Sequence, residues 1–190
     1  TDNASFNIDG SSLRITNPPN FESQTTYTVR IRTTDQGSLT YDEAFTITIN
    51  NVNEAPTDIA LSASSINENV PGNSPVGTLS STDPDAGNTF IYTLVAGTGD
   101  TDNASFNISG SNLRITNSPD FEAKNSYTVR IRTTDQGSLT YDESFTITIN
   151  NVNESPTDIA LSASSINENV AGNSTVGTLS TTDPDAGNTF

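Results

Sequence analysis

The chain repeats itself with a period of 100 residues. Residues 1–90 recur as residues 101–190 with 13 differences in 90 aligned positions. Solenoid and propeller units repeat about every 20 to 50 residues, so a unit of this length is a whole domain. The sequence therefore predicts a tandem array of one domain, of which the chain covers nearly two periods.

The composition is strongly acidic and lacks the residues that bind soft metals. The chain has 23 Asp and Glu against 7 Lys and Arg, a formal net charge of −16, and no His or Cys. The charge disfavours nucleic acid and anionic lipid surfaces as partners. The missing side chains exclude disulfides, the usual zinc and copper sites and thiol nucleophiles. The remaining ligand chemistry is that of oxygen, which suits hard ions such as calcium.

Apolar side chains alternate with polar ones in short runs. Tyr127, Val129 and Ile131 form one such run, and Phe145 and Ile147 begin the next, which predicts two antiparallel strands. Similar runs lie at 58–62, 76–82, 90–96, 104–109 and 112–117. Seven short strands without a helical period predict a β-sandwich. No apolar run approaches the roughly 20 residues of a membrane helix, so we expect no membrane insertion of this segment.

Proline residues mark where one domain ends. Pro56 and Pro156 follow the last strand run of each period, where proline blocks further pairing and stiffens the chain. We therefore place domain boundaries near Glu54 and Glu154. The predicted units are 1–54, the last four strands of a domain; 55–154, a complete domain; and 155–190, the first two strands of a third.

The incomplete end units allow two interpretations. The chain is either a segment of a longer array, or the C-terminal half of one chain completes the N-terminal half of the next. The second interpretation lacks a counterpart for the strand expected in residues 91–100, so we favour the first. Concentration-dependent polymers in size-exclusion chromatography would favour the second.

Acidic strings recur at the expected ends of the domains. The chain contains, in order, INEN (66–69), DPDAG (83–87), PDFE (119–122), TTDQG (133–137) and NNVNESP (150–156). With these motifs in register, the whole chain resembles bacterial-type cadherin repeats. The resemblance implies an all-β fold of tandem seven-stranded Greek-key β-sandwiches, cadherin- or immunoglobulin-like, joined end to end.

The resemblance also implies that residues from two domains and their linker enclose up to three calcium ions at each junction. The first junction would use Glu22, Asn51, Asn53, Glu54, Asp83, Asp85 and Asp135. The second would use Glu68, Asp120, Glu122, Asn151, Asn153, Glu154, Asp183 and Asp185. Asn51 and Asn151 stand where animal cadherins usually carry Asp. Asn20 replaces the acid of Asp120, so we expect the first junction to bind calcium more weakly.

A solvated face that only confers solubility is the simpler interpretation of these acids. They cluster at domain ends, however, whereas the strand faces carry Thr and Arg. Carboxylates about 4 to 6 Å apart repel one another by about 1 to 4 kcal/mol at effective dielectrics between water and a protein surface. We therefore expect a linker that flexes without metal and locks with it.

The predicted function is a calcium-rigidified structural repeat of an extracellular stalk, filament or adhesin shaft, located outside the cell or on its surface. Its expected partners are further copies of the repeat, in the same or neighbouring chains, and cell-surface proteins or polysaccharide. The alternative is a homophilic or polysaccharide-binding adhesion module. Paired acids such as Asp120 and Glu122 also occur in glycosidases. Calcium would hold them ionised, and no insertion forms a cleft, so we predict no enzyme and no catalytic residue.

Overall fold

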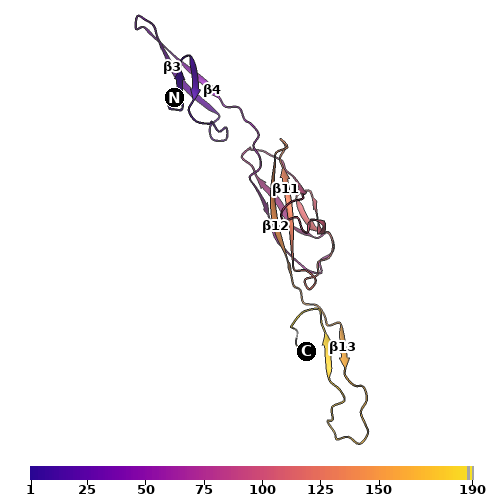
Figure 1. Cartoon of the computed structure of the whole chain (residues 1–190). Coiled ribbons are helices and arrows are strands. Elements are labelled where there is room, and N and C mark those ends of the chain that lie inside the picture. Colours follow the sequence, from indigo (N-terminus) through magenta and orange to yellow (C-terminus); the bar gives the residue numbers. More distant parts are fainter. Residues whose placement is uncertain (188, 190) are drawn as a thin grey trace.

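The protein is all-β and extended along one direction (Figure 1). The computed structural model describes residues 1–187 and 189. Within these residues there is no α-helix, and the only helical turns are the 3₁₀ turns η1 (Asn3–Ser5) and η2 (Asn103–Ser105). The same residues contain no helix with the length and apolarity of a membrane span. Three units follow one another along the chain.

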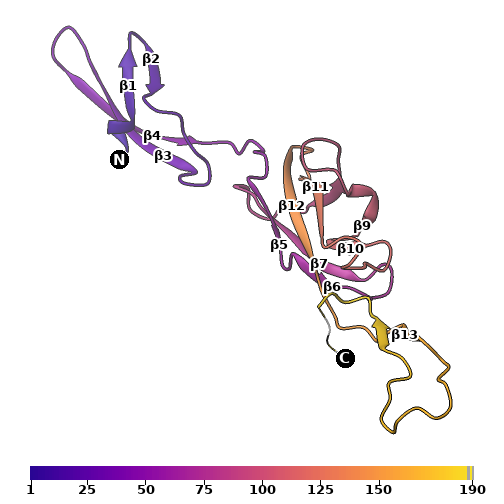
Figure 2. The same cartoon turned by 60° about the horizontal axis from the view of Figure 1, so that its bottom comes forward.

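The middle unit consists of two four-stranded sheets (Figure 2). One sheet has the order β5-β7-β10-β9 and the other the order β6-β12-β11-β8. The strands are β5 (Asp58–Leu61), β6 (Ser65–Asn67), β7 (Pro75–Thr82), β8 (Ile91–Leu94), β9 (Phe106–Ser109), β10 (Asn112–Ile115), β11 (Ser126–Thr134) and β12 (Thr140–Asn150). All neighbours are antiparallel except β6 and β12. The predicted all-β sandwich is therefore confirmed.

Strand β6 is the element that the sequence did not predict. After β5 the chain crosses to the other sheet, where the Ser64 carbonyl accepts the Thr148 N–H and β6 pairs in parallel with the end of β12. A three-residue strand with Ile66 as its one apolar residue is too short to show alternation. The crossing places Glu68, which follows β6 directly, at the end of β12, where its N–H donates to the Asn150 carbonyl over 3.1 Å.

The core of the middle unit lies between its two sheets. Val129, Ile131, Ile147 and Ile149 are at most 1% exposed, as the alternation of their strands predicted. A chain of hydroxyl groups crosses this core. The Ser81 hydroxyl on β7 lies 3.1 Å from the Tyr92 hydroxyl and 2.9 Å from the Thr133 hydroxyl, both on the opposite sheet. These polar groups are buried or half-buried and have hydrogen-bond partners, as stable cores require.

The outer units repeat parts of the middle one. The first has β1 (Phe6–Asp9), β2 (Ser12–Ile15), β3 (Thr26–Thr34) and β4 (Thr40–Thr48), and the last has β13 (Asp158–Leu161) and β14 (Leu179–Thr182). Ile159 is 72% exposed whereas its equivalent Ile59 is 2% exposed, because no second sheet covers β13 among the residues that the structure describes. The boundaries near Glu54 and Glu154, and the exchange of halves between chains, stay predictions.

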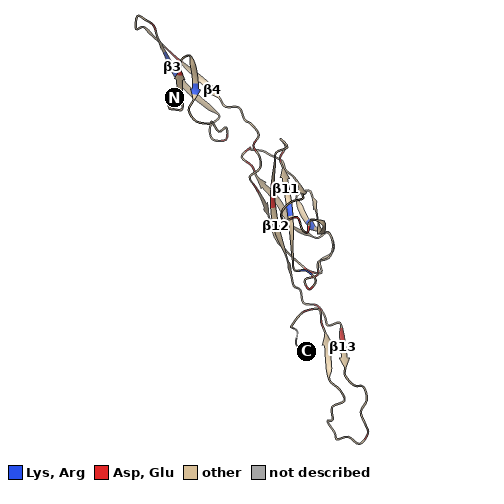
Figure 3. Cartoon of the chain, in the orientation of Figure 1, with Lys and Arg blue, Asp and Glu red and all other residues tan. Residues whose placement is uncertain are grey.

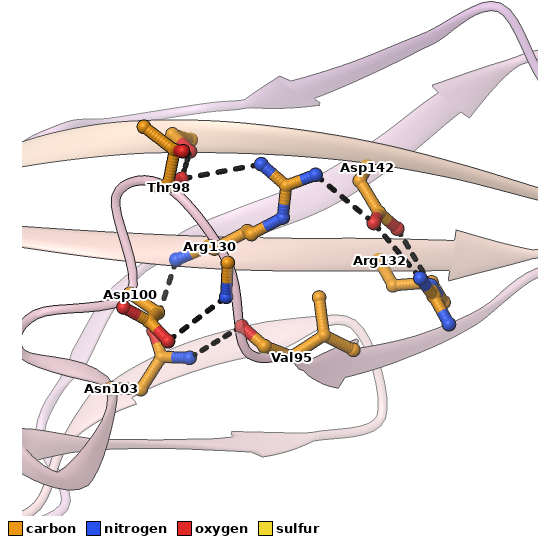
Figure 4. Close-up of polar contacts among 9 residues, drawn as sticks. Val95, Thr98, Asp100, Asn103, Arg130, Arg132 and Asp142 are labelled. Atoms are coloured by element: carbon orange, nitrogen blue, oxygen red, sulfur yellow. Dashed lines mark hydrogen bonds and ion pairs between the residues drawn. The ribbon is translucent and has the colours of Figure 1, made fainter.

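The loop after β8 lies against the outer face of β11 and β12 (Figure 4). Arg130 donates to the Thr98 carbonyl and to Asp142, and the Ser144 hydroxyl donates to the same carbonyl. Arg132 donates two hydrogen bonds to Asp142, of 2.6 and 2.9 Å. Both arginines therefore have intramolecular partners, and the loop is fixed to the sheet.

Replacing Asp142 with Asn tests this cluster. The hydrogen bond from Arg132, and then those from Arg130, hold the pKa of Asp142 below its usual value of 3.8. Because the folded-state pKa is depressed, the stabilisation is present above pH 3.8 and is lost as the pH falls through the lower folded-state value. We expect Asp142→Asn to lower the free energy of unfolding by about 1 kcal/mol at neutral pH, since the pair is partly solvated. Urea unfolding should show a smaller difference in strong acid, and equal differences at both pH values would contradict this assignment.

Candidate metal centres at the two junctions

Three acidic side chains meet where the first unit joins the second. Glu22 comes from the loop between β2 and β3, Glu54 from the linker after β4, and Asp85 from the turn after β7. Each offers a carboxylate oxygen that lies within 4.8 Å of the other two. Acidic residues lie near both linkers in Figure 3, and the arginines lie on strands. The upper unit, the linker and the lower unit thus contribute one acid each.

Asp85 connects the linker to the lower unit. Its Oδ1 accepts the side-chain amide of Asn51 over 2.7 Å, and its Oδ2 accepts the Glu54 N–H over 2.9 Å. The bond from the Glu54 backbone, and then that from Asn51, lowers the pKa of Asp85. Asp83 accepts the Asp85 N–H over 2.9 Å and so shapes the turn that presents Asp85. The lowered pKa favours the ionised form of Asp85. The residue is 8% exposed, so this charge lies largely out of water.

Glu54 lies beside the Asp85 carboxylate, and the surroundings of Glu54 disfavour its charged form. Burial raises its pKa, and the charges of Glu22 and Asp85 raise it further. Its Oε2, like Oδ2 of Asp83, is buried and has no hydrogen-bond partner. Burying a carboxylate oxygen that has no hydrogen-bond partner among like charges is unfavourable. A positive charge close to these three acids would offset their repulsion.

The second junction contains two groups of acids that share one residue. Glu68, Asp120 and Glu122 form the upper group, and Glu122, Glu154 and Asp185 form the lower one. Within each group the oxygens lie within 4.8 Å of one another. Burial raises the pKa of Glu122, and the charges of Glu68, Glu154 and Asp185 raise it further. Glu122 therefore experiences like charges from both sides of the junction.

Glu68 is the best supported acid of the second junction. It is 2% exposed, its Oε2 accepts the Phe121 N–H over 2.8 Å, and its Oε1 accepts the Val152 N–H over 2.7 Å. The carboxylate thus joins the PDFE turn to the linker through their backbones. A group held in this way has a fixed orientation toward its acidic neighbours.

Glu154 has one oxygen with a partner and one without. Its Oε1 accepts the side-chain amide of Asn69 over 2.5 Å, whereas its Oε2 is buried and unpartnered. Its backbone N–H donates to Asp185 over 2.7 Å, as Glu54 does to Asp85. Asn69 was absent from the predicted site. Its position as the last residue of the INEN motif is the sequence signal that points to it.

The remaining predicted positions lie beside these groups and complete no group of three acids. They are Asn51, Asn53, Asp83, Asp135, Asn151, Asn153 and Asp183. Asn53 donates to Asp135 over 2.7 Å, Asn151 to Glu122 over 3.2 Å, and Asn153 to the Glu154 carbonyl over 2.9 Å. The amides therefore neighbour the predicted acids and offer neutral oxygen ligands there.

The donor set fits a hard divalent cation. The junctions combine carboxylates and side-chain amides, and the chain has no His or Cys. Calcium binds about six to eight such oxygens in flexible geometry. The buried unpartnered oxygens of Glu54, Asp83 and Glu154 are the atoms that a cation would satisfy.

No protein-family model matches the sequence, and no curated protein matches it. Solved structures do match. Extracellular cadherin domains 1–4 of protocadherin gamma B7 give a TM-score of 0.66 at 20% identity, with 96% of this chain and 47% of that chain covered. Domains 3–6 of protocadherin gamma B2 give 0.65 at 21% identity, with 97% and 46% covered. Human protocadherin-24 EC1-2 gives 0.58 at 18% identity, with 80% and 79% covered.

The chain spans just under half the length of the first two of these structures. The cadherin resemblance of the motifs is thus confirmed for the fold, over nearly the whole chain. Its bacterial type stays a prediction. The protein has the fold of tandem cadherin extracellular domains.

Proposed function

We propose that the protein is a calcium-binding structural repeat whose junctions become rigid when calcium binds. The observation that carries the proposal is the pair of buried, unpartnered oxygens, Oε2 of Glu54 and Oε2 of Glu154, one at each junction. Each belongs to a group of three acids drawn from the units above and below and the linker between them. A cation in such a group neutralises the repulsion and cross-links the three segments.

The proposed ligands follow from these groups. At the first junction they are Glu22, Glu54 and Asp85, with Asn51, Asn53, Asp83 and Asp135 beside them. At the second they are Glu68, Asp120, Glu122, Glu154 and Asp185, with Asn151, Asn153 and Asp183 beside them. Calcium would supply the positive charge there, and up to three ions per junction is the proposed upper limit.

The two junctions are proposed to differ in affinity. Asn20 accepts the Ser23 N–H over 2.7 Å, as Asp120 accepts the Ala123 N–H over 2.9 Å, so both residues stabilise the same turn. They differ in charge. Because a neutral amide oxygen attracts calcium less than a carboxylate, the first junction should saturate at the higher calcium concentration.

The proposed setting is an extracellular or cell-surface stalk, filament or adhesin shaft. Weak sites with dissociation constants of about 0.1 to 1 mM are typical of extracellular calcium-binding modules. Further copies of the repeat are the proposed partners, and no catalytic role is proposed.

Small-angle X-ray scattering of the full chain tests the stiffening. The chain is measured in about 2 mM calcium, above the dissociation constants of such modules, and again in chelator. Calcium is expected to increase the maximum dimension and to narrow the distribution of interatomic distances. Sodium chloride at matched ionic strength is the control for general screening. An unchanged maximum dimension would remove the support for rigidification.

A homophilic adhesion module is the second candidate. One matching structure is described as the cis-dimer of protocadherin gammaB7 EC3-6, with a TM-score of 0.60 at 22% identity. Analytical ultracentrifugation with calcium separates the candidates, because a saturable dimer favours adhesion and a monomer favours a spacer. A glycan array tests polysaccharide binding, because saturable binding to a glycan favours the adhesion module over a spacer.

A further inference from the structure

The tip of the β11–β12 hairpin contacts the linker that precedes the middle unit. Asn53 donates from Nδ2 to Oδ2 of Asp135 over 2.7 Å and to the Glu54 carbonyl over 3.1 Å. Oδ1 of Asp135 accepts the Leu139 N–H over 2.8 Å within the tip. Asp135 is 4% exposed. One carboxylate oxygen thus holds the hairpin, and the other holds the linker.

Gly137 lies beside this hydrogen bond. Its backbone is outside the left-handed region, so its φ angle does not require glycine. A Cβ atom at this position would overlap Cγ, Oδ1 and Nδ2 of Asn53. These are the end atoms of a flexible side chain, so the amide of Asn53 would have to move away. The space left by Gly137 is what admits the Asn53 side chain.

The first repeat provides an internal comparison. Residues 33–43 have the same sequence as residues 133–143. Asp35 and Leu39 form the same two hydrogen bonds within the tip, of 2.9 and 2.8 Å. A Cβ atom on Gly37 would meet only the Asp35 side chain, at an ordinary 3.4 Å. The hairpin itself therefore accommodates alanine, and the linker is what excludes it.

We infer that Gly137 is a positioning residue. Together with Asp135 it forms a seat for the Asn53 side chain, which holds the linker on the unit that follows before any metal binds. The inference deepens the proposed function, on which its bearing on calcium rests, because Asn53 and Asp135 lie beside the proposed ligands of the first junction. The Glu54 N–H donates to Asp85 over 2.9 Å and so also attaches the linker to the middle unit. Hydrogen exchange of this amide therefore measures whether the linker stays attached.

The test compares Gly137→Ala with Gly37→Ala in the full chain in the presence of chelator. NMR measures hydrogen exchange of the Glu54 amide and the side-chain amide signals of Asn53. Gly137→Ala is expected to accelerate Glu54 exchange roughly tenfold, since a hydrogen bond to a carboxylate is lost. It is also expected to move the Asn53 signals toward those of a solvated amide. Gly37→Ala, the matched control, is expected to change neither.

Asn53→Ala completes a double-mutant cycle. In that background, Gly137→Ala should add no further acceleration, because the side chain on which it acts is gone. Protection of the Asp135 amide, which donates to the Leu139 carbonyl, shows whether the hairpin stays intact. Unchanged Glu54 exchange in Gly137→Ala, equal acceleration in the Asn53→Ala background, or lost Asp135 protection would each overturn the inference. Because all measurements are made without calcium, failure of the seat is distinct from failure of calcium-induced stiffening, which scattering reports.

Discussion

Saturating calcium is expected to raise the midpoint of thermal unfolding of the middle unit by roughly 10 to 20 °C for each occupied site. A ligand that binds only the folded state adds about 2.7 kcal/mol per site at 100 times its dissociation constant. In a domain of about 100 residues, each kcal/mol moves the midpoint by roughly 4 to 8 °C. Acids of the middle unit contribute to groups at both junctions, so both add to the shift. Scanning calorimetry in calcium and in chelator measures it.

Two controls separate binding from a general charge effect. Magnesium at the same concentration should give a smaller shift, because it demands near-octahedral geometry and gives up its water reluctantly. Asp85→Asn should reduce the calcium shift, whereas Asp158→Asn, an exposed acid on β13 outside the groups, should not. Equal midpoints in calcium and chelator would exclude the proposed sites.

Glu68→Ala is expected to lower the free energy of unfolding by about 3 to 5 kcal/mol, even in chelator. The substitution removes the acceptor of two backbone N–H groups, those of Phe121 and Val152. Hydrogen bonds to charged groups contribute about 1.5 to 3 kcal/mol each, and buried donors that lose their acceptor add a desolvation cost. Urea unfolding of the middle unit in chelator measures the loss without any contribution from calcium.

Glu168 offers the matched control for this experiment. It occupies the same position one repeat later and is exposed. Glu168→Ala should change the free energy of unfolding by no more than about 0.5 kcal/mol, as is usual for surface positions. Similar losses in the two variants would show that the backbone bonds of Glu68 do not stabilise the unit.

The strands illustrate what could be predicted without coordinates. Residues such as Val129 and Ile147 point to one face because strand side chains alternate with a period of two, so burial of that face follows from the order of residues alone. The short strand β6 lacks that signal. Its position depends on pairing with β12, which begins more than 70 residues later along the chain.

The candidate sites show the same division more sharply. Oxygen as the ligand atom followed from composition, and the acidic motifs indicated the ends of the domains. The individual groups could not be read from spacing, because Glu22, Glu54 and Asp85 come from three separate segments. Asn69 was missed because only the fold places its amide on Glu154. Gly137 was missed because its role depends on a linker side chain 84 positions earlier.

The order of amino acids by itself determined the repeating unit, the alternating strands and the restriction to hard-ion chemistry, because each depends on local periodicity or on which side chains exist at all. Only the tertiary structure decided which carboxylates meet, which of their oxygens lose water without gaining a donor, and where an absent Cβ makes room for an amide. These properties depend on distances of a few ångströms between segments far apart along the chain. Electrostatic repulsion, hydrogen bonding and steric exclusion act at that range.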